Sequence, residues 1–174
     1  LTIPVVYNTS SFDSLEALSL MRGKVDVYLA DFKYASALEA GKLSHAPRYP
    51  EIALAAIEEM VAQVPVWEED DEGLLLKGVI VRHLVLPGRV EESKRALATL
   101  HDRFGGSVRL SIMSQYTPLV SGLERYGLAG RVTEEEYEEV LDYADSLGVE
   151  DYFWQQGDAA QESFVPEFNG EGVR

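Results

Sequence analysis

Three charged residues, Asp31, Lys33 and Arg82, have the types and surroundings needed to hold a polar ligand. Asp31 and Lys33 follow a run of alternating apolar residues. On such a strand their side chains leave the same face, with their bases about 6.5–7 Å apart. Arg82 interrupts a strongly apolar run, and a guanidinium is almost never buried without an anion beside it. We therefore expect Arg82 to face either Asp31 or the carboxylate of a ligand.

Neutral polar side chains follow the other predicted strands. In parallel α/β proteins, ligands bind at the carboxyl ends of the strands, so we expect these side chains to join the charged residues there. No nucleophile beside a general base is evident, and the set suits the binding of a zwitterion that carries a ribose better than it suits hydrolysis. These neutral residues are Asn8, Thr9, Ser10, Gln115, Tyr116, Gln155 and Gln156.

The apolar periodicity predicts five strands that alternate with helices. The strands are expected at 3–7, 25–31, 79–86, 108–113 and 151–155, and the helices at 12–22, 50–64, 90–104 and 133–148. Segment 35–49 is expected to be a polar connection, and the acidic run 68–72 a solvated loop. His83 is expected to pack under a helix with one hydrogen bond, and Thr133 with Glu136 forms a predicted capping box.

This alternation predicts a parallel sheet with right-handed crossovers in a single domain, 1–174, whose residues 157–174 form an irregular tail. No glycine-rich fingerprint follows the first strand, so a Rossmann nucleotide site is not supported. Five strands are too few for a closed eight-stranded barrel. The expected fold is therefore a partial, TIM-like (β/α) barrel, truncated at its N-terminus. Its exposed first strand invites homodimerisation.

The composition narrows the classes of partner. The chain has 174 residues, with 30 Asp and Glu against 15 Lys and Arg, a formal net charge of −15. This charge repels phosphate backbones and anionic lipid, so neither nucleic acid nor a membrane is an expected partner. No apolar run of about 18 residues and no signal-peptide pattern is present, and we expect a cytoplasmic location. The chain has no cysteine, which excludes disulfides and thiolate-bound metal within it.

Three stretches, 7–10, 29–33 and 81–88, together resemble the later strands of radical S-adenosylmethionine enzymes of the pyruvate formate-lyase activating type. Segment 113–118 is similar to a less characterised branch of that group. The similarity covers most of the chain and keeps the order of the family's motifs. Each motif is weak by itself, whereas the ordered set is fairly specific.

This resemblance implies a partial barrel that binds a 4Fe-4S cluster through three cysteines spaced C-x3-C-x2-C. It also implies an electron donor, and reductive cleavage of S-adenosylmethionine to a 5′-deoxyadenosyl radical. In activating enzymes that radical takes a hydrogen from the backbone glycine of a glycyl-radical enzyme. Because this chain begins at Leu1, directly before a strand, and lacks cysteine, it looks like the C-terminal portion of a longer enzyme. We expect it to bind no cluster and to be inactive by itself.

The resemblance also implies roles for individual residues. Arg82 would hold the carboxylate of S-adenosylmethionine, and Leu84 would line its adenine. Tyr116 stands where the activating enzymes usually have a histidine. The implied S-adenosylmethionine contacts are Asn8, Ser10, Asp31, Lys33, Arg82, Leu84 and Tyr116, and the implied monovalent-cation ligands are Asn8, Thr9, Leu29 through its carbonyl, and Asp31.

Three alternatives remain open. Orotidine-phosphate decarboxylases carry D-x-K-x-x-D after a strand, but Ser36 stands where the second carboxylate would be. A Schiff-base aldolase would need an uncharged Lys33, whereas the neighbouring Asp31 favours the charged form. The third alternative is a binding module without catalytic activity. A longer reading frame containing C-x3-C-x2-C would favour the radical enzyme over this module.

Overall fold

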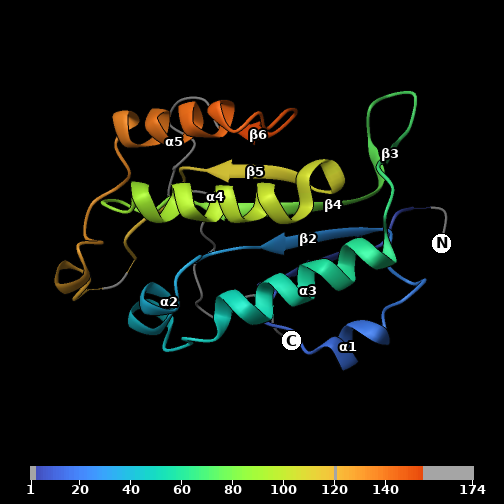
Figure 1. The fold of residues 1–174 in the computed structure, drawn as a ribbon, viewed down its shortest axis with the longest axis horizontal. Coiled ribbons are helices and arrows are strands. Elements are labelled where there is room, and N and C mark those ends of the chain that lie inside the picture. Colours follow the sequence, from blue (N-terminus) through green and yellow to red (C-terminus); the bar gives the residue numbers. More distant parts are fainter. Residues whose placement is uncertain (1–2, 120, 155–174) are drawn as a thin grey trace, which may run out of the picture.

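The computed structural model describes residues 3–119 and 121–154, which form an α/β protein with one mostly parallel six-stranded sheet (Figure 1). The strands run in the order β1-β2-β4-β5-β6, and every neighbouring pair in that order is parallel. Each successive parallel strand is added on the same side, with no reversal of order. The strands are β1 Val6–Thr9, β2 Val27–Asp31, β3 Glu68–Glu69, β4 Leu75–Leu84, β5 Arg109–Met113 and β6 Phe153–Trp154. The predicted α/β class and the parallel pairing of the five expected strands are confirmed, whereas β3 is a sixth strand that pairs antiparallel with β4.

Two of the helices have the capping signals that the sequence carries. Pro50 lies in the first turn of α3, where its missing N–H breaks no hydrogen bond. Thr133 and Glu136 form the predicted capping box at the start of α5. The helices are α1 Leu15–Ser19, α2 Ala37–Ser44, α3 Tyr49–Gln63, α4 Val90–Phe104 and α5 Glu134–Ser146, with short 3-10 turns η1 Gly105–Ser107 and η2 Glu124–Tyr126.

The expectation of a polar connection over 35–49 is wrong, because α2 lies within it. The side chain of Ser36 accepts a hydrogen bond from the Glu39 N–H and caps the helix. Ala40 is the buried residue of α2. One cap and one inward apolar residue are too weak a signal to identify so short a helix from sequence.

The acidic run is also not simply a loop. Glu68 and Glu69 form β3, which pairs antiparallel with β4, and the Glu68 carboxylate lies 3.0 Å from Lys77 Nζ. The backbone of β4 and the side chain of Lys77 provide the bonding partners of β3, and the acidic sequence by itself does not indicate them. At the start of the chain, β1 begins later than predicted and α1 is shorter than the predicted 12–22 helix.

The two faces of the sheet differ. Side chains at alternate positions, such as Tyr28, Val81 and Ile112, are fully buried in one apolar core with the helices. Figure 1 shows α3 and α4 on this side of the sheet. The neighbouring positions, including Arg82 and Leu84, are only partly buried. The helices therefore pack against one face and leave polar side chains on the other.

Several expectations fall on residues outside this description. Gln155 and Gln156, and the predicted tail 157–174, lie outside the described residues. Within the described part of the chain, every helix is too short or too polar to cross a membrane.

A candidate ligand site at the carboxyl ends of β2, β4 and β5

Pairing of β2 with β4 brings the charged residues together. Asp31 is aligned with Arg82 in the parallel register, so both side chains leave the same face of the sheet. Arg82 Nε donates to Asp31 Oδ1 at 2.8 Å, and Arg82 Nη2 lies 2.7 Å from the same oxygen. Of the two anions expected beside Arg82, the structure therefore contains Asp31.

This ion pair is part of a larger polar group. Arg82 Nη2 also donates to Asn8 Oδ1 at 2.7 Å, and Lys33 Nζ lies 3.7 Å from Asp31 Oδ2. Among the described residues, Arg82 Nη1 has no hydrogen-bond acceptor, and the Lys33 side chain is 45% exposed. Two cations share one carboxylate, so the group retains a net positive charge that can attract an anion.

A cavity of about 400 Å³ opens beside these residues. Its volume lies within the roughly 300–1,000 Å³ typical of small-molecule sites. Charged groups line part of it, while leucine, methionine and tyrosine side chains line the rest. The lining residues are Asp31, Lys33, Tyr34, Arg82, Leu84, Leu86, Met113, Gln115 and Tyr116.

Five of the seven expected S-adenosylmethionine contacts, Asp31, Lys33, Arg82, Leu84 and Tyr116, line this cavity. Asn8 reaches the group through Arg82. Ser10 is not among the lining residues; its carbonyl accepts a hydrogen bond from Tyr49.

The expected monovalent-cation ligands are only partly brought together. Asn8 and Leu29 are aligned across β1 and β2, on the face that carries Asp31. The Thr9 side chain belongs to the alternate position and bonds with Asp13. Both Asn8 Oδ1 and Asp31 Oδ1 already contact the Arg82 guanidinium. A monovalent cation at these oxygens would lie next to the guanidinium charge of Arg82, which disfavours it. Residues 3–119 and 121–154 contain no group of three or more His, Asp or Glu that could hold a metal ion.

Tyr49, a residue that the sequence analysis missed, fixes the ends of β1 and β2. It is only 4% exposed, and its hydroxyl lies 3.0 Å from the Ser10 carbonyl and 2.9 Å from the Asp31 carbonyl. The same oxygen accepts the Lys33 N–H at 3.0 Å. Burial raises the pKa of this hydroxyl, so it stays protonated. From the sequence, a tyrosine at the start of a helix does not indicate that its hydroxyl bonds to these distant backbone groups.

His83 links the same region to α4. The ring is 2% exposed, with Nδ1 2.8 Å from the Phe32 carbonyl and Nε2 3.0 Å from Ser93 Oγ. Burial lowers the pKa of the imidazole, which is therefore neutral. Because a carbonyl only accepts, Nδ1–H donates to Phe32 and Nε2 accepts from Ser93. The expected packing under a helix is confirmed, with two hydrogen bonds rather than one.

Ser11, just after β1, is a strained residue that the sequence did not reveal. Its φ is 62°, in the left-handed region that residues other than glycine rarely adopt. The side chain is fully buried, and its hydroxyl has no hydrogen-bond partner among the described residues. Strained backbone and unsatisfied polar groups are enriched at functional sites, which agrees with a site at this end of the sheet.

A second hollow, of about 290 Å³, lies near the start of β5 at the opposite end of the sheet. Arg109 and Asp151 line it, and their side chains form an ion pair at 2.5 Å. In parallel α/β sheets the amino ends of the strands serve stability rather than ligand binding. We therefore assign the candidate site to the cavity beside Arg82.

The fold and this cavity define the protein as an α/β protein with a ligand-sized site where its parallel strands end. No family model matches the chain. A protein of Methanocaldococcus jannaschii, described only as uncharacterized, is 28% identical over 148 residues. That alignment covers 85% of this chain and 40% of the archaeal protein, so the chain spans less than half of this relative.

Proposed function

We propose that this chain is the S-adenosylmethionine-binding portion of a radical enzyme of the pyruvate formate-lyase activating type. The observation that carries the proposal is the cavity of about 400 Å³ in which Arg82, Asp31 and Lys33 face apolar side chains. The proposed architecture is a partial barrel. The unreversed order of the parallel strands and the packing of helices on one face both support it.

The residues of the cavity fit a ligand with an amino-acid end and a nucleoside end. Arg82 Nη1 and the Lys33 ammonium would bind the carboxylate by charge-assisted hydrogen bonds, and Asp31 would accept from the α-ammonium. Leu84, Met113 and Tyr116 would contact the adenosine portion through apolar and aromatic surface. A reduced iron–sulfur cluster held by other residues would supply the one electron that cleaves S-adenosylmethionine to methionine and a 5′-deoxyadenosyl radical.

The cluster does not fit this chain, because the sequence contains no cysteine. The role of the chain's own residues is to bind and orient the ligand and to exclude water from it. In this proposal a longer protein would supply the cluster ligands. That longer protein would also act with the electron donor and on the protein substrate, for which we propose a glycyl-radical enzyme. Dimerisation through β1, which lies at one edge of the sheet, stays a separate prediction.

The lyase alternatives have less support. A Schiff-base lysine must lose its proton, which burial away from carboxylates favours. Lys33 is instead 45% exposed and 3.7 Å from Asp31. The decarboxylase pattern lacks its second carboxylate at Ser36. Borohydride treatment with a carbonyl substrate, followed by peptide mapping of Lys33, would detect a Schiff base if one forms.

Calorimetric titration with S-adenosylmethionine tests the proposal. We expect saturable binding by the protein, weakened at least about tenfold in Arg82→Met, because a charge-assisted contact to the ligand is lost. The matched control is Arg109→Met, which removes an arginine paired with aspartate at the other end of the sheet. Its affinity should equal that of the original protein.

Leu84→Trp provides an independent test, because it fills the cavity without removing the ion pair. We expect it to abolish S-adenosylmethionine binding while the circular dichroism spectrum is retained. Absence of binding by the unmodified folded protein would overturn the proposal. Equal affinities of the original protein, Arg82→Met and Leu84→Trp would overturn the assignment of the site.

A further inference from the structure

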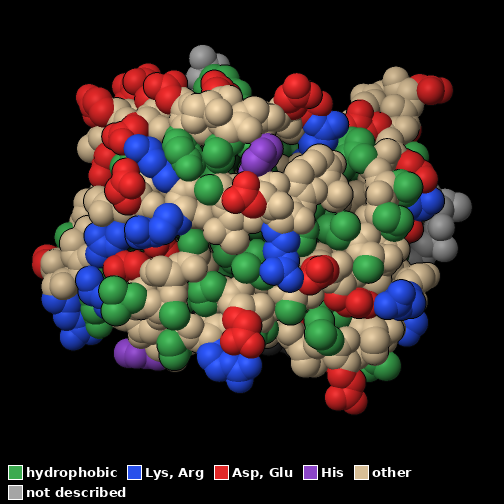
Figure 2. Space-filling model, viewed as in Figure 1, with side chains coloured by type: hydrophobic (Ala, Val, Ile, Leu, Met, Phe, Trp, Pro, Cys, Tyr) green, Lys and Arg blue, Asp and Glu red, His purple; other side chains and the backbone are tan. Residues whose placement is uncertain are grey.

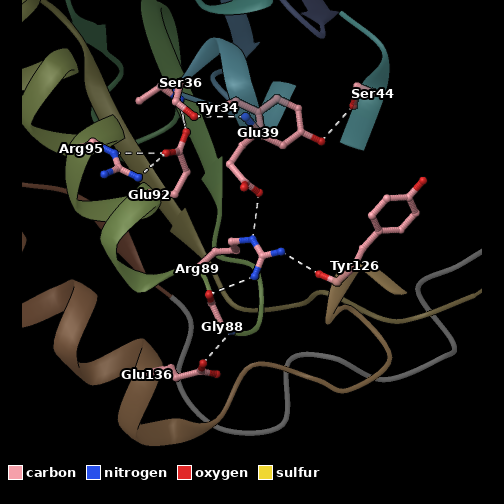
Figure 3. Close-up of polar contacts among 11 residues, drawn as sticks. Tyr34, Ser36, Glu39, Ser44, Gly88, Arg89, Glu92, Arg95, Tyr126 and Glu136 are labelled. Atoms are coloured by element: carbon pink, nitrogen blue, oxygen red, sulfur yellow. Dashed lines mark hydrogen bonds and ion pairs between the residues drawn. The ribbon is translucent and has the colours of Figure 1, made fainter. Parts of the chain in front are cut away.

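Glu92, in the first turn of α4, holds the segment that leaves β2. Its side chain is 6% exposed, and Oε1 accepts hydrogen bonds from the N–H groups of Ala35 at 2.8 Å and Ser36 at 2.7 Å (Figure 3). Oε2 accepts from Arg95, whose Nη2 lies 2.9 Å away. The carboxylate therefore fixes the backbone directly after Lys33 and Tyr34, two residues of the cavity.

The charge of Glu92 strengthens this contact. Burial by itself would raise the pKa of this carboxyl, but the hydrogen bonds from Ser36, Arg95 and Ala35 together lower it below its usual value. The side chain is therefore a carboxylate with three partners. A buried glutamate is stable only with such pairing, and charge-assisted hydrogen bonds of this kind are stronger than neutral ones.

Arg89, directly before α4, holds a second segment. Nε donates to Glu39 Oε2 of α2 at 2.9 Å, and Nη2 donates to the Tyr126 carbonyl of η2 at 2.6 Å (Figure 3). The side chains of Arg89 and Glu39 are only 20% and 16% exposed. The helix-covered side of the molecule in Figure 2 has basic and acidic side chains next to one another at the end where α4 begins.

The segment held by Arg89 is connected to the cavity through Tyr116. The hydroxyl of Tyr116 donates to the Leu128 carbonyl at 2.8 Å, and Leu128 is 6% exposed. Tyr116 lines the cavity on the side of β5. Glu92 and Arg89, three positions apart, thus contact two segments that are connected to the cavity. Segment 33–36 lines it through Lys33 and Tyr34, and segment 126–128 bonds to the lining residue Tyr116.

We propose that the start of α4 is a positioning element for the ligand cavity, in which Glu92 fixes segment 33–36 and Arg89 fixes segment 126–128. Neither residue touches the ligand. Glu92 acts through a segment in which Lys33 and Tyr34 line the cavity, and Arg89 acts through one in which the Leu128 carbonyl bonds to Tyr116 of the cavity. The effect on ligand affinity rests on the proposed function, whereas the effect on the two segments does not.

Amide hydrogen exchange of the ligand-free protein, resolved by residue, tests the positioning role. In Glu92→Gln, exchange of the Ala35 and Ser36 amides should rise at least about tenfold, because an uncharged side chain is a weaker acceptor. The amides of residues 126–128 should not change. In Arg89→Met, exchange of the amides of residues 126–128 should rise, and exchange of the Ala35 and Ser36 amides should not change. Lys94→Met is the matched control on the same helix, since Lys94 bonds to Glu91 and Glu139, which are both exposed.

Should Arg89→Met fail to fold, Arg89→Lys tests the same link, because lysine keeps the charge but lacks the guanidinium that contacts Glu39 and the Tyr126 carbonyl together. Exchange that rises evenly over the whole molecule in the Glu92 and Arg89 variants would overturn the proposal, and so would no change in either segment. S-adenosylmethionine titration of the same variants is a separate readout. We expect Kd to rise about tenfold in both, because each variant weakens a charge-assisted contact that positions the cavity. Failure of the original protein to bind would count against the proposed function, while the exchange pattern still decides the positioning role.

Discussion

Two arginine–aspartate pairs lie at opposite ends of the same sheet and differ in their surroundings. Arg82 and Asp31 are aligned on neighbouring strands, with side chains 23% and 21% exposed, and Asn8 adds a third partner. In the other pair, Arg109 is 29% exposed and Asp151 is 74% exposed. The first pair lines the cavity of about 400 Å³ at the carboxyl ends, whereas the second lines the smaller hollow of about 290 Å³ and its aspartate is largely exposed.

The difference extends to the residues behind each pair. At the carboxyl ends, three helices each contribute a buried polar side chain that bonds near the end of a strand. Tyr49 bonds to the Asp31 carbonyl of β2, Ser93 to His83 of β4, and Tyr137 to the Ile112 carbonyl of β5. At the amino ends, Arg109 stacks over the Trp67 ring at 5.1 Å, and the exposed Lys77–Glu68 pair holds β3. Buried polar networks cost desolvation and are stable only when satisfied. The contacts of Tyr49, Ser93 and Tyr137 therefore fix the chain near the strand ends that border the cavity.

The largest expected effect comes from removing one hydroxyl at the carboxyl ends. Tyr49→Phe keeps the ring but leaves the Lys33 N–H without its partner and removes the hydroxyl's contacts with two carbonyls. We expect a loss of about 3 kcal/mol in the free energy of unfolding. Tyr152→Phe is the matched control, because its hydroxyl bonds to an exposed Asp145 and should cost less than about 1 kcal/mol. Urea denaturation measures both, and equal losses would contradict the comparison.

The two arginines provide the second test. Arg82→Met should lower the free energy of unfolding by about 2 kcal/mol, because it removes charge-assisted hydrogen bonds to Asp31 and Asn8. Arg109→Met should cost less than about 1 kcal/mol, since its partner is largely solvated. Thermal and urea unfolding of the two variants should rank them in this order. The reverse ranking would mean that the pair at the amino end is the more important one.

A third test uses pH. Burial lowers the pKa of His83 in the folded protein. In the unfolded chain the histidine has its ordinary pKa of about 6.5. Below pH 6.5 the unfolded chain therefore binds more protons than the folded protein, until the pH reaches the folded-state pKa. Stability present above about pH 6.5 should therefore fall as the pH decreases, by up to about 1.4 kcal/mol per pH unit for this one group. His83→Gln should flatten the dependence directly below pH 6.5. An unchanged slope in that variant would assign the effect to other groups.

The smallest expected effect is a gain. Ser11→Ala removes a buried hydroxyl that has no partner among the described residues, and should raise the free energy of unfolding by about 1 kcal/mol. Ser10→Ala, at an exposed neighbouring position, should change it by no more than a few tenths of that. If Ser11→Ala is more stable but also binds S-adenosylmethionine less well, its hydroxyl contributes to the site. A loss of stability would show that the hydroxyl has a role in the fold.

Much of the fold could be predicted because its signals are local. A strongly apolar run identified β4, expected at 79–86 and observed at Leu75–Leu84, and helical periodicity with a glycine after it identified α4 with its bounds. The capping box did the same for the start of α5. Elements whose stability comes from distant partners, α2 and β3, were missed.

The candidate site shows the same division. That Arg82 requires an anion follows from the chemistry of a guanidinium in an apolar strand. That the anion is Asp31 follows from the register of β2 against β4, over a separation of 51 residues. The contacts of Glu92 with Ala35 and Ser36 span 57 and 56 residues. No pattern within a strand or helix carries that information.

The sequence by itself determined the alternation of strands and helices, the acidic charge, the absence of cysteine and the need of Arg82 for a counter-charge. Only the tertiary structure decided which side chains share the cavity and which hold it in shape. The physical reason is that residue type sets what a side chain requires, whereas the crossovers and the strand register set which distant group satisfies it.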